Sequence, residues 1–299
     1  MGGGSYSTSS RVLRATSLGY YDKPREEIFT SRNISNAMNP KGVMLREARD
    51  SEEHPDTVPI ILALDVTGSM GSIPHHLVKD GLPHVMGTII QRGVAHPQLM
   101  FLAIGDHECD QAPLQVGQFE SSDELLDKWL TSVWLEGRGG GNEGESYLLA
   151  WYFAAYRTSI DSFEKRGKKG FLFTIGDEPT LKKLPLHAVK KIMGEGQYDD
   201  FTAANLLEKA REKYHVFHLH VAETSAGSRP ETVNGWKQMM QDNLIIVKNH
   251  EDIPRVMAET IIALTGVTES EYIAVNEDVP TGECPPPAQP SDATDHDML

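Results

Sequence analysis

The sequence predicts an α/β protein with a doubly wound, mostly parallel open sheet that helices cover on both faces. Short continuous apolar runs, typical of strands buried on both faces, alternate along the chain with segments of helical apolar spacing. Three of the strongest apolar runs end in an aspartate, namely Asp65, Asp106 and Asp177. A chain of 299 residues is long enough for such a sheet to bury an ample core.

The first half of the pattern begins with an expected strand at 58–64, a continuous apolar run. A helix is expected over 72–92, because its apolar residues recur at helical spacing, and Pro83 inside it should kink or interrupt it. The second apolar run, 98–104, predicts another strand. A weaker strand is expected at 114–119.

The middle of the chain adds two expected helices. Residues 123–134 predict a helix with Ser121 or Ser122 as its N-cap. A glycine-rich loop, 137–144, then leads into a helix expected over 146–165.

The last part of the chain repeats the alternation. Its final helix should begin at Glu251 or Asp252 and end near Leu264, with Gly266 as a stop. The expected strands before it are 170–175, 214–222 and 244–247, and the expected helices are 202–213 and 231–242.

The net charge of −15 is unevenly distributed over three expected regions. Residues 1–57 are poor in apolar side chains and predict an irregular arm, whereas 58–267 form the folded domain. Residues 268–299 hold eight acidic side chains, no Lys or Arg and five prolines, which predicts a disordered tail or an acidic docking peptide. The overall negative charge argues against nonspecific binding to nucleic acid or to an anionic membrane.

Cysteine content and hydropathy bear on the compartment. Cys109 and Cys284 are the only cysteines, so a disulfide framework is excluded and a reducing compartment is favoured. No run approaches the roughly 20 apolar residues of a membrane helix, and the first residues lack the apolar core of a signal peptide. We therefore expect a cytoplasmic protein.

Oxygen-bearing side chains follow the first expected strand at alternate positions, as Asp65, Thr67 and Ser69. Gly68 lets the chain turn so that both hydroxyls point the same way as the carboxylate. A compact cluster of oxygens with low charge suits a hard divalent cation such as Mg²⁺. A single aspartate here would more often cap a helix, and a single hydroxyl would more often form a turn.

With these motifs, the chain resembles a von Willebrand factor type A domain that carries a metal-ion-dependent adhesion site. The family pattern Asp-x-Ser/Thr-x-Ser matches Asp65, Thr67 and Ser69, and the aspartate that follows the family's central fourth strand matches Asp177. The resemblance covers about residues 58–266 and implies an open, doubly wound sheet with one antiparallel edge strand, at 114–119.

The second loop departs from the family pattern, which usually supplies a Thr there. Gly141 occupies that place, and the loop is closer to a subset of intracellular type A domains with Gly-Gly-Gly-Asp/Asn and a downstream Glu. Asn142 joins the expected ligands, and Glu145 or Ser146 could fill the same role, directly or through water. Glu143 is a weaker candidate, because a second directly bound carboxylate would weaken the ion's attraction for a partner's acid.

Asp106 lies in the acid-rich segment 105–110, which should lie at the same sheet edge. It could orient metal-bound waters or form a solvated rim. For the whole site, the resemblance implies binding rather than catalysis. A divalent cation, Mg²⁺ or else Mn²⁺ or Ca²⁺, would keep a position open for an acidic side chain of a partner protein.

The sequence also allows two other interpretations. Asp65 also resembles the nucleophile of haloacid-dehalogenase-like phosphotransferases, although that family normally has Asp where Thr67 stands, and Asp199-Asp200 do not follow an apolar strand. His215, His218 and His220 could ligate zinc, or His218 and His220 could form a polar strand face under a helix, which we favour. The glycine-rich loop lacks Gly-Lys-Ser/Thr, so a nucleotide loop is not expected.

Overall fold

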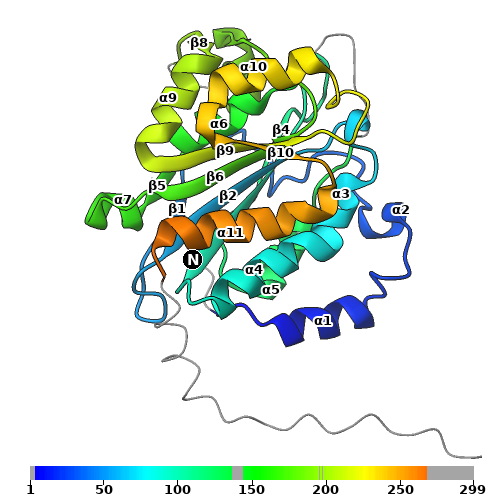
Figure 1. The fold of residues 1–299 in the computed structure, drawn as a ribbon, viewed down its shortest axis with the longest axis vertical. Coiled ribbons are helices and arrows are strands. Elements are labelled where there is room, and N and C mark those ends of the chain that lie inside the picture. Colours follow the sequence, from blue (N-terminus) through cyan, green and yellow to red (C-terminus); the bar gives the residue numbers. More distant parts are fainter. Residues whose placement is uncertain (1–3, 137–143, 195, 197, 268–299) are drawn as a thin grey trace, which may run out of the picture.

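A six-stranded sheet forms the centre of the computed structural model, which describes residues 4–136, 144–194, 196 and 198–267 (Figure 1). The strand order is β10-β9-β6-β2-β3-β4, and only the edge strand β4 runs antiparallel, against β3. This confirms the predicted fold class. The strands are β2 (Val58–Asp65), β3 (Pro97–Ile104), β4 (Leu114–Val116), β6 (Gly170–Gly176), β9 (Tyr214–Val221) and β10 (Leu244–Val247).

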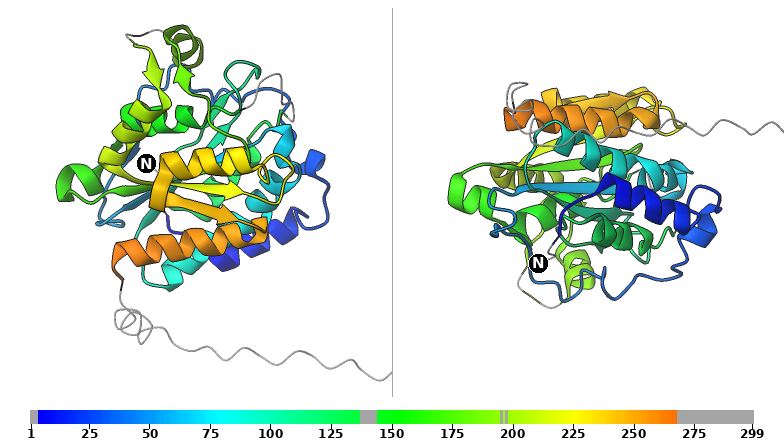
Figure 2. Two further views of the ribbon diagram at one scale, coloured as in Figure 1. Left: turned by 45° about the horizontal axis from the view of Figure 1, so that its top comes forward. Right: turned by 90° about the horizontal axis from the view of Figure 1, so that it is seen from below.

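Helices cover both faces of the sheet (Figures 1 and 2). Successive side chains of β2 point to opposite faces: Ile60 and Leu62 enter one apolar core and Ile61 enters the other. The first core packs under α3 (Ile73–His76), α4 (Leu82–Gln91), α5 (Asp123–Thr131) and α11 (Ile253–Thr265). The second packs under α6 (Tyr147–Tyr156), α8 (Leu186–Met193), α9 (Ala203–Lys213) and α10 (Pro230–Met240).

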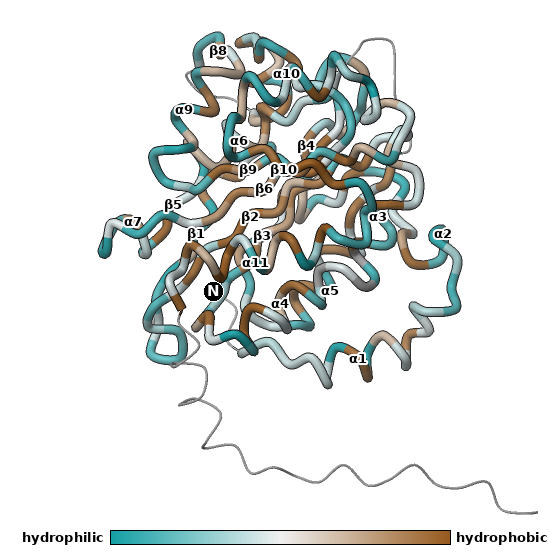
Figure 3. The backbone as a smooth tube through the Cα atoms, viewed as in Figure 1, coloured by the Kyte–Doolittle hydropathy of each residue, from teal (hydrophilic) through white to brown (hydrophobic). Residues whose placement is uncertain are grey.

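Hydrophobic residues are frequent along the central strands (Figure 3), as expected for a sheet buried on both faces. No helix among the described residues is long and apolar enough to span a membrane.

The prediction of one continuous helix over 146–165 is wrong in the middle of that range. The chain forms α6, then a short strand β5 (Thr158–Ile160), then α7 (Asp161–Arg166). β5 pairs in parallel with β1 (Arg46–Ala48), so a partner more than a hundred residues away overrides the helical pattern. Two further features were not predicted: α8, and the small antiparallel pair of β7 (Lys183–Leu184) and β8 (Phe201–Thr202) that flanks it.

The interruption expected near Pro83 is confirmed. A π-helical turn, Leu77–Gly81, separates α3 from α4. Pro83 has no N–H to donate to the Lys79 carbonyl four residues earlier. Instead, Arg11 Nη2 donates to that carbonyl at 3.2 Å, and the Tyr6 hydroxyl donates to the Pro83 carbonyl at 2.9 Å.

Residues 4–57 lie against the sheet and its helices. They contain α1 (Thr8–Ser17), α2 (Arg25–Ile28) and β1. Met38 is fully buried, and its carbonyl accepts a hydrogen bond from the Val116 N–H at 2.8 Å. The acidic tail expected at 268–299 lies outside the described residues.

Helix α6 approaches the sheet very closely at one point. A methyl group on Gly176, the last residue of β6, would overlap the hydroxyl of Tyr147. The Tyr147 ring also packs edge-on against His218 and Trp236, and these two rings stack at 3.5 Å between centroids. Only glycine at position 176 therefore allows α6 to lie where it does.

Arg11→Ala should lower the free energy of unfolding by about 3 kcal/mol, because it removes the closer of the two cations beside the buried carboxylate of Asp127 and leaves only Arg14, whose Nη1 is 3.9 Å from Asp127 Oδ2. Arg11 Nε lies 3.1 Å from Asp127 Oδ1, and both side chains are under 5% exposed. Chemical denaturation measures the change, and Arg11→Met with Asp127→Leu should cost less than the single change. Arg255→Ala breaks the exposed ion pairs with Asp252 and Glu259 and should leave the denaturation midpoint unchanged. An unchanged midpoint in Arg11→Ala as well would contradict this account.

Gly176→Ala should destabilise the protein by about 2 kcal/mol or more, because the new methyl group displaces Tyr147. Gly235→Ala is the matched control, since Gly235 lies in α10 with nothing within 4 Å of an added Cβ. That change should stabilise by about 0.5–1 kcal/mol. Thermal denaturation of both variants would show opposite signs; two shifts of the same sign would contradict the packing argument.

Candidate metal centre

The loop after β2 gathers three oxygen-bearing side chains. Asp65 is fully buried, and its Oδ1 accepts hydrogen bonds from the Thr67 N–H at 2.9 Å and the Thr67 hydroxyl at 2.6 Å. The chain then turns through the 3₁₀ segment Gly68–Met70, which places Ser69 Oγ 3.3 Å from Thr67 Oγ1. Ser69 is exposed, so the cluster reaches the surface at this residue.

Asp177 joins the same cluster from the neighbouring strand. It directly follows β6, which pairs with β2 in parallel, so both carboxylates lie at one edge of the sheet. Asp177 is fully buried, and its Oδ1 accepts a hydrogen bond from Ser69 Oγ at 2.9 Å. The structure thus brings Asp65, Thr67, Ser69 and Asp177 together.

Two further hydroxyls complete the hydrogen bonds of these carboxylates, and sequence reasoning missed both. The Tyr147 hydroxyl donates to Asp65 Oδ2 at 2.7 Å, and the Thr224 hydroxyl donates to Asp177 Oδ2 at 2.7 Å. Tyr147 lies in an apolar helix, where it looks like a core residue. Thr224 follows β9, and its place just after a parallel strand was the one signal that could have found it.

Burial and repulsion from neighbouring carboxylates raise the pKa of two acids of this site, Asp65 and Glu145. Burial, with the charge of Asp177, raises the pKa of Asp65 to about 7. Burial, with the charge of Asp65, raises the pKa of Glu145 to about 10. No ion pair to Asp65, Asp177 or Glu145 occurs in the described part of the chain. The cluster therefore favours a cation as its missing counter-charge.

Among the described residues of the second loop, Glu145 is the best candidate to complete this cluster. Its backbone N–H donates to the Pro179 carbonyl at 2.8 Å, which holds it beside the loop that carries Asp177. Its Oε2 is buried and has no hydrogen-bond partner among the described residues. Asn142, the expected ligand from this loop, lies outside the described residues.

Ser146 and Asp106 take different places. Ser146 Oγ accepts a hydrogen bond from the His107 N–H at 2.9 Å and lies 2.7 Å from His107 Nδ1, so it joins two loops. Asp106 is buried; its Oδ1 accepts a hydrogen bond from the Glu108 N–H at 2.8 Å, while no described residue bonds to its Oδ2. Asp106 also raises the pKa of Glu145, after burial and the charges of Asp65 and Asp110. Asp106 is therefore not part of a solvated rim.

The donor set suits a hard cation. Hydroxyl and carboxylate oxygens lie close together here, and two buried carboxylate oxygens, Glu145 Oε2 and Asp106 Oδ2, find no hydrogen-bond partner in the part of the chain that the structure describes. Among the described residues, no group of three or more His, Cys, Asp or Glu is placed to hold a metal ion. The candidate centre therefore depends on Thr67 and Ser69 as much as on the acids.

The two alternative readings gain no support. His218 stacks on Trp236, and His220 Nε2 bonds to the Gly227 carbonyl at 2.8 Å, so both are buried core residues, as the favoured reading expected. Asp199 and Asp200 precede β8, outside the six-stranded sheet, where Asp200 accepts the Leu186 N–H at 2.7 Å.

Comparison with known proteins gives similarity of fold at low identity. No family model matches the chain, and no curated protein matches it in sequence. The solved structures with a similar fold include the pilus adhesin SpaC of Lactobacillus rhamnosus GG, at 12% identity and a TM-score of 0.48. That match covers 71% of this chain and 31% of SpaC, so this chain spans about a third of that protein.

Two other similar structures are matched over nearly their whole length. The vWF domain of the type V pili tip protein Mfa5 from Porphyromonas gingivalis has 10% identity and a TM-score of 0.46, over 71% of this chain and 96% of that one. The conserved hypothetical protein BatB from Bacteroides thetaiotaomicron has 12% identity and a TM-score of 0.43, over 70% and 98%.

Proposed function

We propose that this chain is a metal-dependent protein-binding module. The observation that carries the proposal is the pair of buried carboxylates, Asp65 and Asp177, which two hydroxyl side chains bridge and which no basic side chain of the described residues neutralises. Leaving two such acids buried without a counter-charge is costly, and a bound cation removes that cost.

Thr67 and Ser69 would hold the cation through their hydroxyls, with Asp65 and Asp177 as carboxylate ligands, directly or through water. From the second loop, Asn142 or Glu145 would complete the set. Mg²⁺ suits this site best because it prefers oxygen ligands and keeps several waters; Mn²⁺ or Ca²⁺ would be the alternatives.

The side chains around the centre leave one direction open. Asp65, Thr67 and Asp177 are buried, whereas Ser69 is exposed, so a ligand from outside would approach past Ser69. Where the carboxylates act through water, the cation is bound directly by hydroxyl and water oxygens, so it supplies positive charge there and favours an incoming anion. We propose that this anion is the carboxylate of a Glu or Asp in a partner protein.

Phosphoryl transfer by Asp65 is the competing function, and the contacts of Asp65 argue against it. Both of its oxygens already accept hydrogen bonds, from Thr67 and from Tyr147, within a fully buried site. A nucleophilic carboxylate needs an oxygen that can reach the phosphorus.

Titration calorimetry with Mg²⁺ or Mn²⁺ tests the metal centre. The wild type should bind one equivalent, Asp65→Ala with Thr67→Ala should not bind, and Ser69→Ala should bind at least roughly tenfold more weakly. Ser228→Ala is the control, because Ser228 is also exposed but its hydroxyl donates only to the Ser225 carbonyl. Unchanged binding in the Asp65 and Thr67 variant would overturn the metal centre.

An assay with p-nitrophenyl phosphate and Mg²⁺ separates binding from catalysis. We expect no turnover above that of Asp65→Ala. Turnover that disappears in Asp65→Ala would instead establish the phosphotransferase reading.

A further inference from the structure

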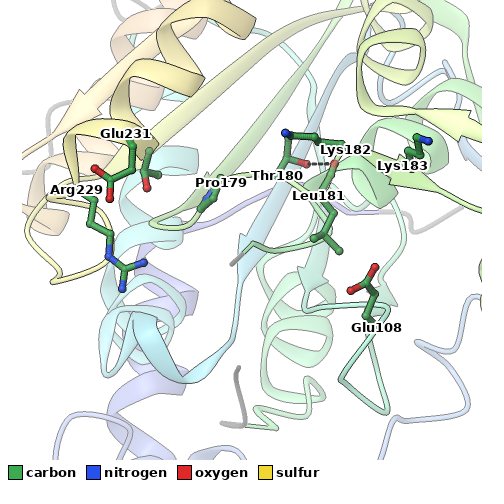
Figure 4. A pocket seen from close by; sticks show the side chains of 9 residues that line it. Glu108, Pro179, Thr180, Leu181, Lys182, Lys183, Arg229 and Glu231 are labelled. Carbon is green, nitrogen blue, oxygen red and sulfur yellow. Dashed lines mark hydrogen bonds between the residues drawn. The ribbon is translucent and has the colours of Figure 1, made fainter. Parts of the chain in front are cut away.

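A groove opens beside the candidate metal centre (Figure 4). Its volume is about 630 Å³. Residues 179–183 form its floor and one side, and the start of α10 with Arg229 and Glu231 forms the other. Glu108, from the loop after β3, also lines it. We call it the basic groove, for the charges described below.

The floor of the basic groove is fixed to the metal centre. Pro179 lies two residues after Asp177, and its carbonyl accepts the Glu145 N–H at 2.8 Å. The Leu181 N–H donates in turn to the Glu145 carbonyl at 2.9 Å, and the Trp236 indole N–H donates to the Glu178 carbonyl at 3.0 Å. A chain bound at the cation would therefore continue directly into the groove.

Positive charge is concentrated here, in a protein of net charge −15. Lys182 and Lys183 are exposed on one side, and Arg229 lies on the opposite side (Figure 4). Two carboxylates, Glu108 and Glu231, line the groove with these three cations, and Arg229 Nη1 also lies 3.9 Å from Glu178 Oε2. The excess of positive charge therefore lies on the side of Lys182 and Lys183.

The basic stretch continues beyond the groove into α8. Residues 179–194 contain four lysines and no acidic residue, and Lys190 and Lys191 are exposed. Burial lowers the pKa of His107, the charges of Asp106 and Glu108 raise it, and the charges of His187 and Lys191 lower it, so α8 lies close to the segment that carries Glu108. The surface next to the groove is thus also basic.

We propose that the basic groove binds an acidic, extended segment of the partner protein, next to the carboxylate that the cation takes. This inference rests on the proposed function for the position of the partner. Two observations favour an acidic segment, namely the charge of the groove and its continuity with the metal centre. The cation would bind one acidic side chain, and Lys182, Lys183 and Arg229 would attract the acidic side chains on either side of it. Specificity would then come from the groove, since any exposed carboxylate can reach a metal ion.

Fluorescence anisotropy with two labelled peptides tests the proposal on the full chain. One peptide alternates glutamate with glycine, and the other has a single central glutamate among glycines. In Mg²⁺ the glutamate-rich peptide should bind roughly tenfold more tightly, and the advantage should shrink at high salt because exposed charges are screened.

The decisive variant is Lys182→Gln with Lys183→Gln and Arg229→Gln. Its matched control is Lys168→Gln with Lys209→Gln and Arg255→Gln, which removes the same charge from positions that do not line the groove. The groove variant should lose the preference for the glutamate-rich peptide, whereas the control variant should keep it. Calorimetry should show unchanged Mn²⁺ binding in both variants.

The possible outcomes separate this inference from the proposed function. If both variants keep the preference while binding still needs Mg²⁺, the groove proposal fails and the metal-dependent function stands. If the peptides bind as tightly in EDTA as in Mg²⁺, the metal-dependent function fails. The proposal that the groove acts together with the metal centre then fails too. If neither peptide binds although Mn²⁺ does, capture of an acidic segment is overturned.

Discussion

Two carboxylates are forced together inside this protein by the way its sheet is built. β2 and β6 are neighbours and run in parallel, so the residues that follow their apolar segments meet at one sheet edge. Asp65 and Asp177 are fully buried there, and burial together with the charge of Asp177 raises the pKa of Asp65. The loop conformation after β2, the hydroxyls that point into the cluster and the positions of α6 and α10 all serve to accommodate this pair.

Packing behind the cluster connects the core to the site. Gly176 leaves the space in which the Tyr147 hydroxyl reaches Asp65. The Tyr147 ring rests against Trp236, whose indole N–H bonds to the Glu178 carbonyl, next to Asp177. One aromatic layer thus fixes the loops that carry both carboxylates, so a change in packing there is also a change in ligand geometry.

The same loops explain why a binding groove lies beside the centre. The bonds between Glu145 and residues 179–181 hold the second loop and the loop after β6 as one unit. The surface past this unit carries Lys182, Lys183 and Arg229, whereas the ligands themselves are acids and hydroxyls. A cation at the centre would convert a locally acidic spot into the end of a continuous positive surface.

Local patterns were enough to predict the sheet, most of its helical cover and the cluster of Asp65, Thr67, Ser69 and Asp177, because strand ends and hydroxyl spacing are local features. The residues that support the cluster could not be predicted, because they depend on tertiary contacts. Tyr147 looks like any core aromatic until the space at Gly176 is known. In the same way, β5 exists only because β1 pairs with it, and Ser146, considered as a ligand, bonds to His107.

Anomalous scattering from crystals grown with Mn²⁺ would test the central claim most directly. The account predicts one strong manganese peak within about 2.2 Å of the Thr67 and Ser69 hydroxyl oxygens, on the side of the cluster where Ser69 is exposed. A structure with no manganese at these oxygens, or with manganese bound only elsewhere on the acidic surface, would contradict it.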